Sequence, residues 1–111
     1  MTAFNIVRVR VKPGREDEFI DAHRRVPTDV PGLRRGVLVK TGERVYCFLG
    51  EWDSFAALAA ARPRMDSVLA TFRDTLEELD HGLGIADAVS GEAVLDIEAD
   101  RHSRAYAESM A

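Results

Sequence analysis

Hydrophobic and polar residues alternate over residues 4–12, and this two-residue period predicts a β-strand with two different faces. Val7, Val9 and Val11 fall on one face together with Asn5, whereas the other face carries arginines. Pro-Gly pairs and a Thr-Gly pair punctuate the chain and mark turns between further strands. The predicted strands comprise residues 4–12, 33–40, 44–52 and 88–98.

Between the strands the apolar residues recur every three to four positions, which predicts amphipathic α-helices. The first helix covers residues 15–25 and begins with acidic residues, where the helix dipole favours negative charge. Its apolar stripe consists of Phe19, Ala22, His23 and Val26. A short helix is predicted over residues 54–61. Pro63 suits the first turn of a helix, so a separate helix is predicted over residues 63–80.

The predicted order of elements is βαββαβ. Two helical segments on one side of a four-stranded antiparallel sheet form a ferredoxin-like α+β fold. In that topology the first and last strands are antiparallel neighbours, so Arg8 and Arg10 are expected beside acidic residues of the last strand. Those acidic residues are Glu92, Asp96 and Glu98.

Both faces of the predicted sheet carry apolar side chains. The strand over residues 44–52 points one set of side chains to each face: Val45, Cys47 and Leu49 to one, Tyr46, Phe48 and Trp52 to the other. The helices cover one face, and nothing else in the chain is left to cover the second. We therefore expect a homodimer in which a second copy covers that face.

The composition is that of one soluble domain, expected over residues 1–98, with a polar tail over residues 99–111. Of the 111 residues, 46% are hydrophobic and 31% are charged. A net charge of −4 argues against nucleic acid as a partner, because nucleic acid selects basic surfaces. No apolar run approaches the ~20 residues of a membrane span, and the N-terminus does not read as a secretory signal. The one cysteine excludes an internal disulfide and favours a cytoplasmic location.

Among the titratable residues, His23 is the strongest candidate for chemistry. It lies on the apolar stripe of the first helix, so its ring is expected to face the sheet or the mouth of a pocket. A partly buried imidazole titrates near neutral pH and can act as a general base or contact a substrate. The alternative is a histidine at the edge of the core that makes one hydrogen bond. The sequence contains no zinc-ligand spacing, phosphate loop or triad signature, so no metal site is predicted.

Three short motifs lie around the turns between the predicted elements. They are V-K-P-G-R-E-D-E-F at residues 11–19, P-G-L at residues 31–33 and E-W-D-S at residues 51–54. Together with the βαββαβ order, they resemble the motifs of the antibiotic-biosynthesis-monooxygenase-like group of small dimeric α+β barrels, over residues 4–98. The resemblance implies a dimeric α+β barrel with a pocket between the sheet and the helices of each subunit.

Members of this group that resemble cofactor-independent monooxygenases oxidise electron-rich aromatic molecules, usually polyketide phenols, with dioxygen. The resemblance therefore implies a small aromatic or quinol-type ligand and no cofactor. The group's W-x-S tryptophan matches Trp52, and its arginine on the next helix matches Arg73 when one gap is allowed. Its asparagine and tyrosine positions are taken by Phe48 and Leu58. Phe72 is expected to line the pocket beside Phe48.

In the monooxygenase hypothesis Arg73 holds developing negative charge, His23 moves a proton, and Asn5 contacts the substrate. Two other functions remain open. One is a non-enzymatic barrel that binds a small ligand or serves a stress response. The other is haem binding and degradation, for which the group uses an asparagine on the first strand and a histidine on the helix after W-x-S. Val7 falls at that asparagine position, and the helix predicted over residues 63–80 has no histidine.

Overall fold

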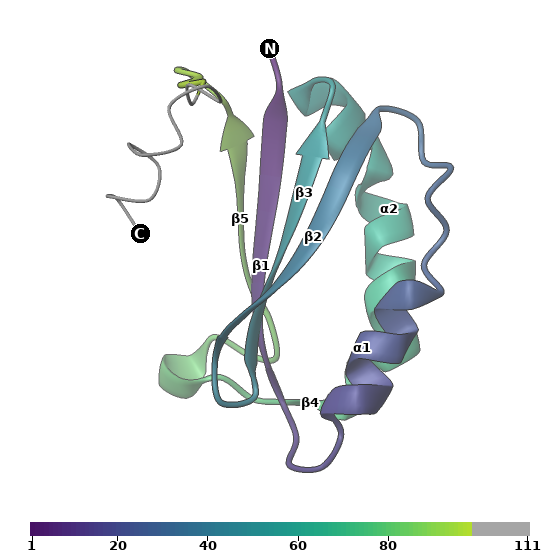
Figure 1. The fold of residues 1–111 in the computed structure, drawn as a ribbon, viewed down its shortest axis with the longest axis vertical. Helices are drawn as coiled ribbons and strands as arrows, with labels where there is room; N and C mark the ends of the chain where they lie inside the picture. The colour runs from purple at the N-terminus through teal and green to yellow at the C-terminus, as the bar shows by residue number, and fades with distance from the viewer. Residues whose placement is uncertain (99–111) are drawn as a thin grey trace, which may run out of the picture.

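The computed structural model describes residues 1–98, an antiparallel sheet with both helices packed on one face (Figure 1). The strands are β1 (Ala3–Val11), β2 (Leu33–Gly42), β3 (Val45–Trp52), β4 (Leu76–Glu77) and β5 (Asp87–Glu92). The helices are α1 (Glu16–Arg24) and α2 (Phe55–Phe72), and short 3₁₀ turns cover Arg73–Thr75 and Asp80–Gly82. The strand order is β2-β3-β1, and β4 and β5 both pair with the remaining edge of β1. The predicted ferredoxin-like α+β fold is confirmed. The predicted tail, residues 99–111, lies outside the described residues.

The alternation predicted for the first strand is confirmed. Asn5, Val9 and Val11 are buried on the face that the helices cover. The pairing of β1 with β3 places Asn5 opposite Gly50, and the pairing with β5 places it opposite Ser90. These three residues form one row across the sheet, on the same face, because directly opposed residues in antiparallel strands point to the same side.

α2 is one continuous helix, which corrects the prediction of two helices separated before Pro63. It begins after Ser54, whose Oγ accepts a hydrogen bond from the Ala57 N–H at 3.1 Å. Pro63 lies inside the helix. Ala61 and Met65, on either side of the proline, pack in one apolar cluster with residues of the sheet. That shared packing offsets the backbone hydrogen bond that a proline removes from a helix interior.

α2 also ends earlier than predicted, at Phe72 rather than at residue 80. The Thr75 hydroxyl donates to the Phe72 carbonyl oxygen at 2.6 Å, within a 3₁₀ turn that redirects the chain. Leu76 then pairs with Val11 in β4, at the edge of β1. Leu76 and Leu79 are buried by this return to the sheet and not on the face of a helix.

The last strand is shorter than predicted, and its register gives the arginines of β1 different partners. β5 ends at Glu92, which lies at the far end of β1 from the arginines. Arg8 pairs with Asp87 and Arg10 with Asp80, each with a nitrogen-to-oxygen distance of 3.2 Å. Within residues 1–98 the expected partners make no ion pair: Glu92, Asp96 and Glu98.

The core between α1, α2 and the sheet is built around Phe19. Its ring centroid lies 5.1 Å from that of Tyr46 and 5.5 Å from that of Phe72, in edge contact with the latter. The Tyr46 hydroxyl donates to the Glu16 carboxylate, which also pairs with Lys40 at 3.0 Å. Apolar and polar contacts together therefore hold α1 on the sheet and fix the side chains of its inner face.

The sheet face opposite the helices carries apolar side chains that the single chain leaves uncovered. Ile6, Val39 and Val89 expose 38%, 39% and 61% of their surface. The register places Ile6 directly opposite both Leu49 and Val89, so these side chains lie on the same face. Soluble proteins rarely leave contiguous apolar surface of this kind without a partner.

Candidate functional site

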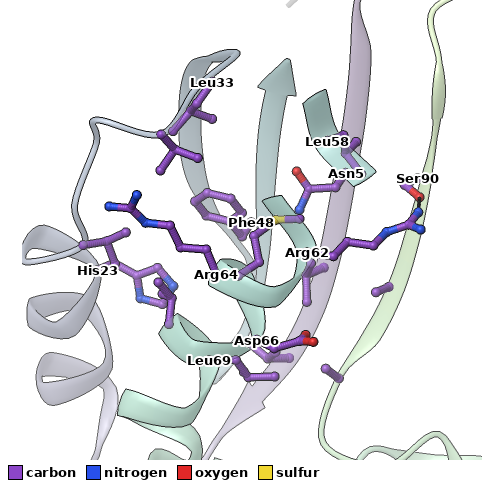
Figure 2. Close-up of a pocket in the computed structure, with 18 of the residues that line it drawn as sticks. Asn5, His23, Leu33, Phe48, Leu58, Arg62, Arg64, Asp66, Leu69 and Ser90 are labelled. Carbon is purple, nitrogen blue, oxygen red and sulfur yellow. Dashed lines mark hydrogen bonds between the residues drawn. The ribbon is translucent and has the colours of Figure 1, made fainter. Parts of the chain in front are cut away.

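A cavity of about 440 Å³ lies between the helices and the inner face of the sheet (Figure 2). Its volume is within the range of about 300–1,000 Å³ of small-molecule sites, and its walls are mostly apolar. Six of the seven residues singled out from the sequence line it: Asn5, His23, Phe48, Trp52, Leu58 and Phe72. They come from α1, α2, β1 and β3, so residues far apart in the chain converge on one space.

Arg73, the seventh residue, does not line the cavity, which corrects the expectation that it would hold charge there. The reason is the early end of α2. Arg73 is the first residue of the 3₁₀ turn after Phe72, and it is exposed. In a helix that continued to residue 80, Arg73 would keep a regular position on the face of α2. The 3₁₀ turn changes the direction of the backbone and moves Arg73 off that face.

His23 reaches the cavity from α1 and sits among aromatic rings. Its ring centroid lies 4.5 Å from those of Phe19 and Phe72 and 6.0 Å from that of Phe48. Burial lowers the pKa of His23, and the hydrogen bond to the backbone of Phe19 opposes that shift only in part. The imidazole is therefore neutral at physiological pH.

The hydrogen bond of His23 determines which ring nitrogen is available. Nδ1 lies 2.9 Å from the carbonyl oxygen of Phe19. A carbonyl oxygen only accepts, so Nδ1 carries the proton and donates it. In the neutral ring Nε2 then has the lone pair, and no hydrogen bond within residues 1–98 occupies it. The side chain is a base with a defined tautomer at the wall of an apolar cavity.

Asn5 and Trp52 form a buried polar pair at the other end of the cavity. The Trp52 indole N–H donates to Asn5 Oδ1 at 2.7 Å. Gly50, opposite Asn5 in β3, leaves the space that this contact needs, since a Cβ there would lie 2.2 Å from Asn5 Oδ1. The sequence placed Asn5 on the inner face of its strand but contained no sign of its partner.

We expect Trp52→Phe to lower the free energy of unfolding by about 1–3 kcal/mol, because it leaves the Asn5 oxygen buried without a donor. Urea denaturation followed by circular dichroism measures the loss. Replacing both partners, in Asn5→Leu with Trp52→Phe, removes the orphaned oxygen, so the double variant should lose less than the sum of the single variants. Strictly additive losses would contradict the pairing.

Charged side chains from α2 stand at the edge of the cavity: Arg62, Arg64 and Asp66. An Arg62 guanidinium nitrogen donates to the Ser90 Oγ at 3.2 Å, and Arg64 pairs with Asp29 at 3.1 Å. Neither arginine was singled out from the sequence. Arg62 fell between the helices predicted over residues 54–61 and 63–80, and Arg64 lay in the first turn of the second helix without a motif around it.

The described residues offer no gathered set of metal ligands: within 1–98, no three His, Cys, Asp or Glu side chains lie close enough to hold an ion. Over the same residues, no helix is long and apolar enough to cross a bilayer.

Comparison with known proteins places these features in a family. Residues 2–64, which span β1 to the middle of α2, match the sequence model described as antibiotic biosynthesis monooxygenase. The chain belongs to this family. A comparison with curated proteins finds no match.

Solved structures share the fold of this family member. A mutant of SnoaB, a cofactor-independent oxygenase from Streptomyces nogalater, is 16% identical, with a TM-score of 0.68 over 86% of this chain and 96% of its own. A conserved protein from Methanosarcina mazei Go1 is 12% identical, with a TM-score of 0.67 over 83% and 92%. MhuD, in a mutant with two manganese protoporphyrin IX bound per active site, is 21% identical, with a TM-score of 0.64 over 87% and 99%. At these identities the likeness establishes the fold alone.

The polar groups of the cavity differ from those that the resemblance associates with the group. Phe48 and Leu58 line the cavity at the positions of the group's asparagine and tyrosine, as the sequence indicated, whereas Arg73 does not line it. The amide inside the cavity is instead that of Asn5, on β1. The polar groups that line the cavity thus come from other elements of the same fold.

Proposed function

We propose that the chain is a cofactor-independent monooxygenase that oxidises a planar, hydroxylated aromatic molecule with dioxygen. The observation that carries the proposal is His23, a neutral imidazole in an apolar cavity whose Nε2 accepts no hydrogen bond from residues 1–98. A base of this kind suits a substrate whose anion, and not its neutral form, reacts with oxygen. The family assignment and the fold shared with SnoaB support the same reaction type.

The proposed reaction begins with proton transfer from the substrate to Nε2 of His23. In a hydroxylated anthrone, for example, the acidic CH₂ between the rings loses a proton and leaves a carbanion that the rings delocalise. The carbanion transfers electrons to dioxygen and forms a C–O bond, and the resulting peroxide loses water. The balance is CH₂ + O₂ → C=O + H₂O, so substrate and oxygen supply every electron and no cofactor is consumed.

The walls of the cavity favour this chemistry in two ways. Phe48, Leu58 and Phe72 surround a flat aromatic body with apolar surface and keep water away from the carbanion. The oxygen of Asn5 accepts from the Trp52 indole, so its NH₂ remains to donate to a substrate oxygen and orient the ligand. Asn5 lies on β1 and Trp52 on β3, so the sheet and not a loop positions this pair.

Oxygen uptake with 1,8-dihydroxyanthrone tests the proposal. We expect consumption of one O₂ per anthraquinone formed, at a rate that rises in proportion to the protein above the spontaneous rate. Saturable binding of the anthrone with no acceleration would instead identify a ligand-binding barrel. A shift of the Soret band on adding haemin, with no anthrone turnover, would favour the haem-binding alternative.

We also propose that two copies pair through the sheet face opposite the helices. The exposed apolar side chains on that face, centred on Ile6, support the pairing. Ile6→Asp introduces a charge at this centre and is expected to convert dimers into monomers in sedimentation velocity at about 10 μM, because burying an unpaired carboxylate is costly. Ala70→Asp, on the exposed side of α2, is the matched control and should leave the mass unchanged. Dimers of folded Ile6→Asp would contradict the pairing.

A further inference from the structure

One end of the cavity contains hydrogen-bond donors from three different elements. Asn5 on β1 and Ser90 on β5 are directly opposed in the sheet, and Arg62 reaches from α2 to bind the Ser90 hydroxyl oxygen at 3.2 Å. All three residues line the cavity. Figure 2 shows the Arg62 side chain extended across the gap between α2 and β5, toward Ser90.

The hydrogen bonds within the protein at this end of the cavity occupy the side-chain oxygens of Asn5 and Ser90 and leave donor groups free. The oxygen of Asn5 accepts from the Trp52 indole, so the group that remains is its NH₂, which points into the cavity in Figure 2. The Ser90 oxygen accepts from Arg62, which leaves the hydroxyl hydrogen to donate. The guanidinium has five N–H donors, and the contact with Ser90 uses one nitrogen.

The charge of Arg62 is not neutralised by an ion pair within the described residues. Arg64, two positions along α2, differs in this respect because Asp29 pairs with it at 3.1 Å. Asp66 also lines the cavity one helical turn after Arg62, yet the two make no ion pair. The guanidinium of Arg62 instead lies over the Phe55 ring, with Cζ 5.6 Å from the ring centroid. This cation–π contact helps to hold the guanidinium in place.

We propose that the molecule bound in this cavity is an aromatic acid whose carboxylate is held by Arg62, Ser90 and Asn5 at this end. The inference rests on the proposed function, because it places the aromatic body of the same ligand in the apolar part of the cavity, toward His23. A planar guanidinium matches the two oxygens of a carboxylate, and charge-assisted bonds of this type are the strong ones. Arg62 is thus a specificity-determining residue for an acidic substrate.

Matched probes test the inference: anthracene-2-carboxylate and its neutral isostere anthracene-2-carboxamide, titrated by fluorescence at low salt. We expect the wild type to bind the acid about two- to fivefold more tightly than the amide, as one exposed charge pair allows. Arg62→Gln keeps a helix-forming residue and removes the charge, so the preference should disappear. Arg64→Gln is the control and should keep the preference for the acid over the amide. Asp66→Asn removes a nearby negative charge and should strengthen acid binding about threefold.

The outcomes separate this inference from the proposed function. Equal affinity of the wild type for acid and amide, or a preference that survives in Arg62→Gln, overturns the role of Arg62 and leaves the monooxygenase proposal standing. Binding of neither probe shows that the cavity does not take an aromatic ligand, which overturns both. A preference for the acid that falls as salt is raised from 20 to 500 mM supports an ionic contact.

Discussion

His23→Gln is expected to lower the rate of anthrone oxidation by about a hundredfold or more, the typical contribution of a positioned general base. Glutamine can still donate to the carbonyl oxygen of Phe19, so the contact that anchors the ring is preserved in kind. It cannot accept a proton at neutral pH, which removes the step that generates the reactive anion. Initial rates of oxygen uptake, corrected for spontaneous oxidation, measure the loss.

The pH profile distinguishes a base from a residue that only packs. Burial lowers the pKa of His23, so the neutral, active form persists below the ordinary histidine value of about 6.5. The acid limb of kcat/KM for the wild type should therefore have its midpoint below 6.5 and should be absent in His23→Gln. The lowered pKa of His23 also makes the free energy of unfolding depend on pH. Between about pH 6.5 and the lower pKa of the folded state, the unfolded state binds more protons than the folded state, so stability falls as the pH is lowered through this range.

His81→Asn is the matched control for this prediction. His81 is exposed and has a backbone φ of 64°, a conformation that asparagine tolerates well. The control should keep both the rate and the acid limb. A His23→Gln variant that oxidises the anthrone at the wild-type rate would eliminate His23 as the base, whatever its position in the cavity.

The parts of the site that depend on local periodicity were predictable from the sequence. A stripe with a spacing of three to four residues located His23 on the inner face of α1, and alternation located Asn5 on the inner face of β1. Both assignments require only the repeat of one element and the knowledge of which side is buried. The expectation that Trp52 lies at the cavity came instead from the resemblance of the E-W-D-S motif to that of the family.

The parts that depend on pairing between distant elements were not predictable. Asn5 and Trp52 are 47 positions apart, and only the register of β1 with β3 brings them together. Arg62 lies at the cavity because packing on both sides of Pro63 keeps α2 continuous, against the local preference of proline. Arg73 lies outside the cavity because α2 ends at Phe72 and the chain returns to the sheet, where Leu76 is buried in β4. In each case tertiary packing outweighed a local tendency.

Gly50→Ala is expected to destabilise the fold strongly, because the added methyl group meets the buried Asn5–Trp52 pair. Its Cβ would lie 2.2 Å from Asn5 Oδ1 and 3.0 Å from Trp52 Nε1, well inside van der Waals contact. Neither side chain can move far, because both are buried and bonded to each other. Overpacking and the lost hydrogen bond together should lower the free energy of unfolding by about 2–4 kcal/mol.

Gly91→Ala isolates the steric cause of that loss, because it makes the same chemical change on β5, in the same sheet, with nothing within 4 Å of the added Cβ. We expect it to change stability by less than about 0.5 kcal/mol in the same urea denaturation experiment. Trp52 is the one tryptophan of the chain, so its fluorescence reports the site directly. Emission should shift to longer wavelength in Gly50→Ala as the indole loses its bond to Asn5. If the two alanine variants were equally stable and had the same emission, the packed Asn5–Trp52 pair would not exist, and the donor arrangement inferred for the cavity would lose its anchor.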